Sequence, residues 1–137
     1  MDTLKVEQYM EYQPASILCD TVLTDVIKIL LEHKTSGAPV VDSEHHVIGF
    51  VSEQDCLKSL LVSGYFCDNI ATAKDVMRSD VLTVTPQDNV VELARRMTDQ
   101  QPKIYPVVVD TKLVGLIDRR RVLEAISKSQ LENIRIW

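Results

Sequence analysis

Two residues suited to ligand binding, Ser52 and Asp55, stand where the apolar stretch Ile48–Val51 ends and an expected helix begins. A phosphate at such a helix start meets free backbone N–H groups and the positive end of the helix dipole. The Ser52 hydroxyl adds a donor, and the Asp55 carboxylate can accept two hydrogen bonds from ribose hydroxyls. Because a carboxylate repels phosphate, the two residues must contact different parts of one ligand.

The same pair also fits a structural role. A serine at a helix N-cap with an acidic residue three positions later resembles a capping box, although the usual partner is Glu or Gln. From spacing alone the cap is favoured over a ligand site. One pair of side chains can perform both roles, so both interpretations stay open.

The densest positive patch is Arg119–Arg121, at the start of the last expected helix. Three cations there oppose the helix dipole, and a solvated charge run is the usual interpretation. The alternative is contact with a phosphate, which an arginine can bind with two parallel hydrogen bonds. The patch stands out because the whole chain, with 15 basic and 20 acidic side chains, has a net charge of −5.

The composition excludes several classes of protein. The acidic balance argues against nucleic-acid binding, and no apolar run is long enough to cross a membrane. The first residues lack the basic start and apolar stretch of a signal peptide, so we expect a cytoplasmic protein without membrane contact. No nucleophile–base pair, glycine-rich phosphate loop or metal-ligand spacing is present, so we expect no enzyme activity and no required cofactor.

The cysteines and paired histidines also predict no metal site. Cys19, Cys56 and Cys67 have no C-x-x-C spacing and are expected to be small buried side chains. His45 and His46 follow Glu44 in a polar stretch between two apolar runs, which predicts a surface turn.

An internal repeat covers most of the chain. A shift of 67 residues places Met10 on Met77 and Pro39–Val41 on Pro106–Val108. After one deleted residue, a shift of 66 places Ile48–Val51 on Val114–Ile117. Two helical stripes with the spacing i, i+3, i+4, i+7 coincide under the first shift: Leu23, Val26, Ile27 and Leu30 with Val90, Leu93, Ala94 and Met97.

The repeat predicts an α+β fold of two related units, residues 1–66 and 67–137, each strand-helix-strand-strand-helix. A unit of about 60 residues buries too little surface to be stable alone, so we expect pseudo-twofold packing, sheet to sheet. Thr85-Pro86 supplies a candidate cap for the second long helix. The expected elements are helical leads at Val6–Tyr9 and Ala73–Met77, strands at Ser16–Leu18 and Leu82–Val84, helices at Val22–His33 and Asn89–Asp99, antiparallel strand pairs at Pro39–Val41 with Val47–Val51 and Pro106–Val109 with Leu113–Ile117, and helices at Gln54–Val62 and Arg119–Ser129.

These features together resemble a tandem pair of cystathionine-beta-synthase (CBS) domains, a Bateman module. The motifs that carry the resemblance are Val6-x-x-Tyr9-Met10, His33–Asp42, Gly49-Phe50-Val51-Ser52-x-x-Asp55, Asp75-Val76-Met77, Tyr105–Val108 and Gly115–Ile117. The resemblance implies a disc that commonly forms homodimers. It also implies a regulatory module that senses AMP, ADP, ATP or S-adenosylmethionine in clefts between the units.

Within this family the ligand role of Ser52 and Asp55 is favoured over a cap alone. The resemblance implies one site formed by Phe50, Ser52, Asp55, Val81, Leu82, Ile104, Tyr105, Pro106 and Arg120. Tyr105 either stacks on the base or fills the core or the dimer interface. Arg120 is the favoured phosphate contact within the arginine patch.

The second cleft departs from the family pattern. Its implied residues are Ser16, Ile17, Gly37, Ala38, Pro39, Asp118 and Arg121. Asp118 repels a phosphate, and the guanidinium of Arg121 only donates hydrogen bonds. We therefore expect one competent site per chain.

A rival hypothesis is a ligand-free module for dimerisation or for binding an unknown protein target. Its support is the tail, where Leu131, Ile134 and Trp137 are spaced to form an apolar docking stripe. The alternative is that the tail continues the last helix and packs on its own body.

Overall fold

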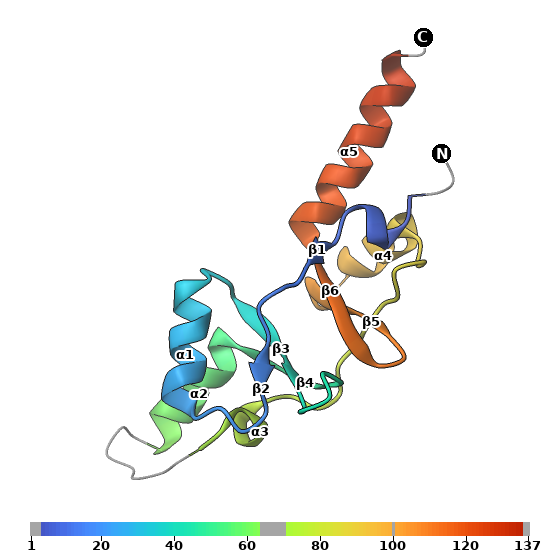
Figure 1. Ribbon diagram of the computed structural model, residues 1–137. Helices are drawn as coiled ribbons and strands as arrows, with labels where there is room; N and C mark the ends of the chain where they lie inside the picture. The colour runs from blue at the N-terminus through green and yellow to red at the C-terminus, as the bar shows by residue number, and fades with distance from the viewer. Residues whose placement is uncertain (1–3, 64–70, 100, 136–137) are drawn as a thin grey trace. The chain divides into compact units, whose positions relative to one another are not determined.

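The computed structural model describes residues 4–63, 71–99 and 101–135 (Figure 1). The chain forms two compact units. Unit 1 comprises Met1–Pro14, Leu82–Asp110 and Val114–Trp137, and unit 2 comprises Ala15–Val81 and Thr111–Leu113. Cys67 and Trp137 lie outside the described residues, as do the side chains of Leu131 and Ile134.

Neither compact unit is one half of the sequence. The segment that precedes the first strand of each repeat, residues 4–14 or 71–81, belongs to the unit built from the rest of the other repeat. The expected boundary between residues 66 and 67 therefore divides the repeats along the chain, whereas the compact units exchange their leading segments.

Unit 2 is a three-stranded sheet with helices. The strand order is β2-β3-β4, with β2 parallel to β3 and β3 antiparallel to β4. Its elements are β2 (Ile17–Leu18), α1 (Leu23–Glu32), β3 (Gly37–Val41), β4 (Val47–Ser52), α2 (Glu53–Ser63) and α3 (Ala73–Val76). The expected antiparallel pair and both flanking helices are confirmed.

The core of unit 2 is formed by apolar side chains from its helices and its sheet. Val26 and Leu30 of α1 are buried against Val40 and Val51 of the sheet, as the helical spacing predicts. The exchanged segment contributes Ala73, which is fully buried in this cluster. Cys56 is 4% exposed, as expected for a small core side chain, and burial raises the pKa of its thiol.

Unit 1 is also a three-stranded sheet with helices, but its third strand, β1, comes from the exchanged segment, whereas the third strand of unit 2 is β2. Its sheet has the order β1-β6-β5, and β5 and β6 are joined by Asp110 and Thr111, whose φ angles of 51° and 66° form a tight hairpin turn. The elements are a 3-10 helix η1 (Val6–Gln8), β1 (Glu11–Tyr12), α4 (Val90–Met97), β5 (Ile104–Val109), β6 (Lys112–Asp118) and α5 (Arg119–Arg135).

The structure corrects two expectations for unit 1. The cap of α4 is Asn89, whose side chain accepts hydrogen bonds from the amides of Val91 and Glu92. Thr85 instead bonds to the carboxylate of Asp88 in the preceding turn. The strand expected at Leu82–Val84 is reduced to one parallel bridge between Val84 and Val107.

A methionine from each exchanged segment packs against a glycine in the centre of a strand. Met77 lies against Gly49 of β4, and Met10 lies against Gly115 of β6. A β-carbon on either glycine overlaps the methionine side chain and approaches a backbone oxygen. Both glycines are therefore required by this close approach, and the repeat preserves both pairs.

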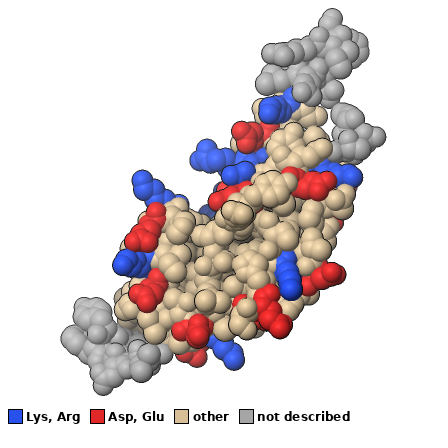
Figure 2. Space-filling view, viewed as in Figure 1, with Lys and Arg blue, Asp and Glu red and all other residues tan. Residues whose placement is uncertain are grey.

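Among the described residues, no helix combines the length and the apolar character needed to cross a membrane. On the face drawn in Figure 2, acidic and basic side chains are interspersed rather than gathered into a field of one sign.

Candidate functional site

Ser52 and Asp55 lie at the junction of β4 and α2, as the sequence predicts. Ser52 is the last residue of the strand, and Asp55 lies in the first turn of the helix. The amide of Asp55 donates to Ser52 Oγ at 3.1 Å. In return, Asp55 Oδ2 accepts from the amide of Ser52 at 3.0 Å and from its hydroxyl at 2.9 Å. The capping box that the spacing suggests is therefore formed.

This local geometry alone does not distinguish a ligand site. Thr72 and Asp75 form the same arrangement at the start of α3, and the backbone and hydroxyl hydrogen bonds from Thr72 lower the pKa of Asp75. Thr85 and Asp88 form a third one. The pair at Ser52 differs because its helix has 11 residues and its acid is held by a cation from elsewhere in the chain.

That cation is Arg78, which the sequence reasoning missed. Its Nε donates to Asp55 Oδ1 at 3.3 Å. The Arg78 side chain is 57% exposed, whereas that of Asp55 is only 9% exposed. Both residues belong to unit 2, so this contact lies within one compact unit.

The backbone fixes where Arg78 projects. Its amide donates to the carbonyl of Phe50 and its carbonyl accepts from the amide of Phe50, both at 2.9 Å. Phe50 is two residues before Ser52, so this bridge sets Arg78 beside the end of β4. No spacing in the sequence indicates this contact, because Arg78 lies 23 residues from Asp55 and is placed beside it by the bridge to Phe50.

The equivalent helix start in unit 1 carries different chemistry. Asp118 Oδ1 accepts from the amide of Arg121 at 2.9 Å, so Asp118 caps α5. The Arg121 side chain donates to the carbonyl of Tyr9 at 3.1 Å. As expected from the sequence, this start offers no carboxylate at the position of Asp55.

The other residues expected at the first site are divided between the units. Val81 belongs to unit 2 and is half-buried. Four others belong to unit 1, as does Tyr105, which is described below. Leu82 and Arg120 are exposed, Ile104 is half-buried and Pro106 is buried. The roles of these residues stay predictions.

Tyr105 lies in the core of unit 1, which favours one of the alternatives left open by the sequence. Its side chain is 0% exposed and belongs to the buried cluster with Leu93 and Ile117. Its hydroxyl has no hydrogen-bond partner among the described residues, and burial raises its pKa. The guanidinium of Arg96 lies 5.4 Å from the ring centroid, within the range of a cation–π contact. A ring so enclosed has no free face for a base.

The residues expected for the second cleft also come from both units. Ser16 is half-buried, and Ile17 and the strand residues Gly37–Pro39 are buried in unit 2. Asp118 and Arg121 belong to unit 1 and are half-buried.

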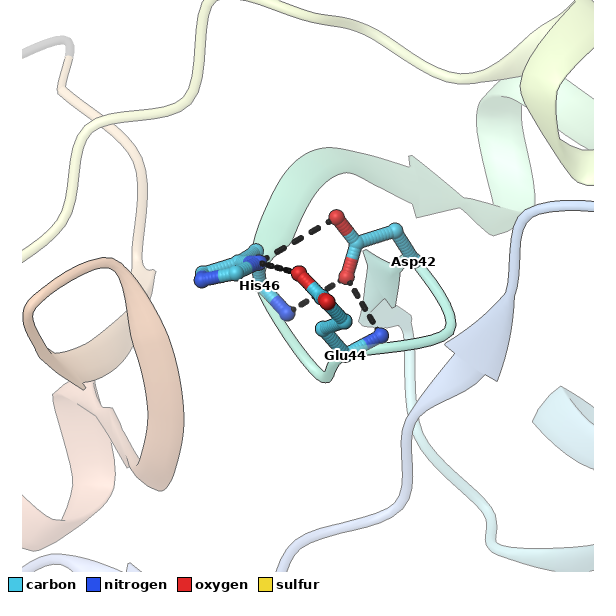
Figure 3. A network of polar contacts seen from close by, with 3 residues as sticks. All are labelled: Asp42, Glu44 and His46. Carbon is cyan, nitrogen blue, oxygen red and sulfur yellow. Dashed lines mark hydrogen bonds and ion pairs between the residues drawn. The ribbon is translucent and has the colours of Figure 1, made fainter.

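The acidic and histidine residues of the β3–β4 turn form a polar network (Figure 3). Asp42 Oδ1 accepts from the amides of His46 at 2.8 Å and Glu44 at 2.9 Å, and these hydrogen bonds lower the pKa of Asp42. The Nδ1 atom of His46 lies 3.3 Å from Asp42 and 3.7 Å from Glu44. In the part of the chain that the structure describes, no three such side chains are grouped to hold a metal ion.

Comparison with known proteins identifies the family. The model of the CBS domain matches residues 6–62 and again residues 73–128. The chain belongs to the CBS domain family. It is a tandem CBS pair, and the two matches reproduce the internal repeat. No catalytic domain is identified in the chain by these matches.

Solved CBS structures share the fold over nearly the whole chain. The protein AcuB from Vibrio cholerae is 27% identical, with a TM-score of 0.84 and coverage of 98% of both chains. A structure of CBSX2 in complex with AMP is 26% identical, with a TM-score of 0.80, covering 92% of this chain and 98% of that one. The CBS pair of MJ0100, solved with 5′-methylthioadenosine and S-adenosyl-L-methionine, shares the fold at 21% identity and a TM-score of 0.78, covering 93% and 98%.

Curated relatives are longer than this chain. A 33.4 kDa protein from the ribosomal RNA operon of Thermofilum pendens is 27% identical over 90% of this chain. The protein MJ1225 of Methanocaldococcus jannaschii is 28% identical over 82% of it. The matched region spans only 40% and 39% of those two proteins.

Proposed function

We propose that this CBS pair is a regulatory, ligand-sensing module that binds an adenosine-containing ligand through Ser52 and Asp55. The observation that carries the proposal is the likeness to CBSX2, which has been solved with AMP, at 26% identity over 92% of this chain. The chemistry of the β4–α2 junction is consistent with it, because a hydroxyl, a carboxylate and a helix N-terminus meet there.

The roles within the site follow from what each group offers. Asp55 accepts hydrogen bonds from the ribose hydroxyls, while backbone amides at the start of α2 face an anionic group. The proposal retains Phe50, Val81, Leu82, Ile104, Pro106 and Arg120 as further contacts, and the backbone of Tyr105 in place of its ring. Binding then biases the conformation of the pair, which transmits the signal.

Calorimetric titration with AMP, ADP, ATP and S-adenosylmethionine tests the proposal. We expect at least one to bind with a stoichiometry of one per chain, and Asp55→Ala to weaken binding tenfold or more, equivalent to about 1.4 kcal/mol. Two ligands per chain contradict the single competent site. Unchanged affinity in Asp55→Ala contradicts the ribose role, and binding by none of the four contradicts the function.

A second function, dimerisation or protein binding, is favoured by the outer face of α2. Leu57, Leu61 and Val62 are 58%, 82% and 87% exposed, and Leu123 of α5, the repeat equivalent of Leu57, is 68% exposed. Apolar side chains gathered on one helix are typical of an interaction surface. Sedimentation of the wild type against Leu61→Gln tests the dimerisation: we expect a homodimer that the substitution weakens, and a monomeric wild type contradicts dimerisation through this face.

A further inference from the structure

Arg78 is placed to couple the proposed site to the charge of its ligand. It is anchored through its backbone to Phe50, and its exposed side chain reaches the nearly buried carboxylate of Asp55. Among the residues that the structure describes, Asp55 is the only side-chain partner of this guanidinium. The remaining N–H groups of Arg78 are therefore available beside the start of α2.

The acceptor capacity of Asp55 limits what can bind there. Each carboxylate oxygen has two lone pairs. Both lone pairs of Oδ2 are used by the amide and hydroxyl of Ser52, and one of Oδ1 is used by Arg78. A ribose that donates both of its hydroxyls needs two acceptor positions, and only one remains. As long as the Ser52 hydroxyl keeps its hydrogen bond to Oδ2, full ribose binding requires Arg78 to leave Oδ1.

The consequence for Arg78 differs between neutral and anionic ligands. A neutral nucleoside displaces the guanidinium from its carboxylate and gives it no new partner. A nucleoside phosphate displaces it and supplies another anion, which an arginine can bind through two parallel hydrogen bonds. A cationic ligand adds repulsion to the displacement. The exchange therefore favours phosphate-bearing ligands.

We propose that Arg78 is a specificity-determining residue, which competes with neutral nucleosides for Asp55 and binds the phosphate of a nucleoside phosphate. The proposal rests on the function proposed for Ser52 and Asp55. It adds a ligand class, nucleoside phosphates in preference to adenosine or S-adenosylmethionine, and a residue that determines it.

The test is the ratio of two dissociation constants, that of adenosine divided by that of AMP, in the wild type and in Arg78→Gln. Arg78→Gln should weaken AMP and strengthen adenosine, so the ratio should fall about tenfold, or about 1.4 kcal/mol. Adenosine too weak for direct titration is measured by displacement of AMP. A fall of at least threefold supports the proposal, and a smaller change overturns it.

A matched control separates this effect from a general change of charge. Arg95→Gln removes another exposed arginine, 67% exposed against 57% for Arg78, that is paired with Glu92 on α4 of unit 1, and it should leave the ratio unchanged. AMP binding to the wild type should also weaken with added salt more steeply than binding to Arg78→Gln, because a charge pair is screened. Equal salt dependence of the two proteins overturns the phosphate contact.

The outcomes distinguish this inference from the function on which it rests. If AMP binds the wild type and Arg78→Gln leaves the ratio unchanged, only the role of Arg78 is wrong. If S-adenosylmethionine binds more tightly than AMP, the adenosine site stands and the preference for phosphate is overturned. If no adenosine compound binds, both proposals fail.

Discussion

The starts of α2 and α5 are equivalent in the repeat, yet they present opposite charges. Each helix is capped by a side chain on the residue before it, Ser52 in unit 2 and Asp118 in unit 1. Three residues later, Asp55 accepts a hydrogen bond from Arg78, whereas Arg121 donates one to the carbonyl of Tyr9. In both units the side chain three residues after the cap contacts the exchanged leading segment, Asp55 through Arg78 and Arg121 through Tyr9.

The comparison separates what the fold requires from what a ligand requires. A helix start needs an acceptor for its free N–H groups, and either a serine or an aspartate supplies it. Ribose recognition needs an acceptor at the third position as well, which a carboxylate provides and a guanidinium does not. The fold thus tolerates both residues at that position, and only unit 2 retains the acceptor.

The largest expected effect comes from giving unit 2 the chemistry of unit 1. Asp55→Arg removes hydrogen bonds to a charged group, each contributing about 1.5–3 kcal/mol, so AMP affinity should fall about a hundredfold or more. Calorimetry measures this, with Glu32→Arg at the exposed end of α1 as a control for the same change of charge. Retained affinity in Asp55→Arg refutes the difference drawn between the two helix starts.

Alanine substitutions at Gly49 and Gly115 should lower the free energy of unfolding by different amounts. A β-carbon on Gly49 lies 2.8 Å from the carbonyl oxygen of Arg78, whereas one on Gly115 lies 3.0 Å from that of Glu11. Overpacking costs about 1–3 kcal/mol, and Gly49→Ala should be at the upper end of this range. Urea unfolding of both variants measures it. If Gly49→Ala and Gly115→Ala have equal free energies of unfolding, or if Gly49→Ala is as stable as the wild type, the closer approach at Gly49 has no energetic effect and the prediction is wrong.

A smaller effect is expected at Tyr105, whose repeat equivalent in unit 2 is Ala38. Because no described residue bonds the buried hydroxyl, Tyr105→Phe should increase the free energy of unfolding by up to about 1 kcal/mol. AMP affinity should stay unchanged, because the ring is enclosed. If Tyr105→Phe is less stable than the wild type, the hydroxyl has a hydrogen-bond partner. If the variant binds AMP more weakly, the Tyr105 side chain takes part in ligand binding.

The smallest effect concerns the β3–β4 turn, which carries an acidic network that the β5–β6 turn at Asp110 and Thr111 lacks. The folded-state pKa of Asp42 lies below its ordinary value of about 3.9. Its contribution to stability is therefore present above that value and is lost as the pH falls through the folded-state pKa.

Asp42→Asn should thus lower the melting temperature at pH 7 and have a smaller effect near pH 2. Melting curves across this range measure the difference, and Asp110→Asn in the other turn controls for the loss of one exposed charge. A penalty for Asp42→Asn that is independent of pH contradicts the role of the carboxylate hydrogen bonds.

Local patterns were sufficient to predict most of the elements. The stripe Leu23–Leu30 and its repeat predicted α1 and α4, and the β-branched runs predicted β3 to β6. The helix cap at Asn89 was missed because Thr85-Pro86 has an equally good local signal. The two-residue strand β1 was missed because it exists only through pairing with β6, which no local pattern reveals.

The candidate site was predictable only in part, for the same reason. Ser52 and Asp55 are three residues apart, so their hydrogen bonds follow from one helix turn. Arg78 lies 23 residues from Asp55, and its position depends on a backbone bridge to Phe50. The side chain of Tyr105 was ambiguous because an aromatic residue on a strand suits a core and a ligand equally well.

The sequence by itself determined the repeat, the CBS family, the order of the elements and the capping pair at Ser52, because each depends on neighbours along the chain or on residue identity. The tertiary structure alone decided that the leading segments are exchanged between the units. It also decided that Arg78 contacts Asp55 and that Tyr105 is buried. These outcomes depend on which strand edge accepts a distant segment, and that choice is made by packing the whole unit.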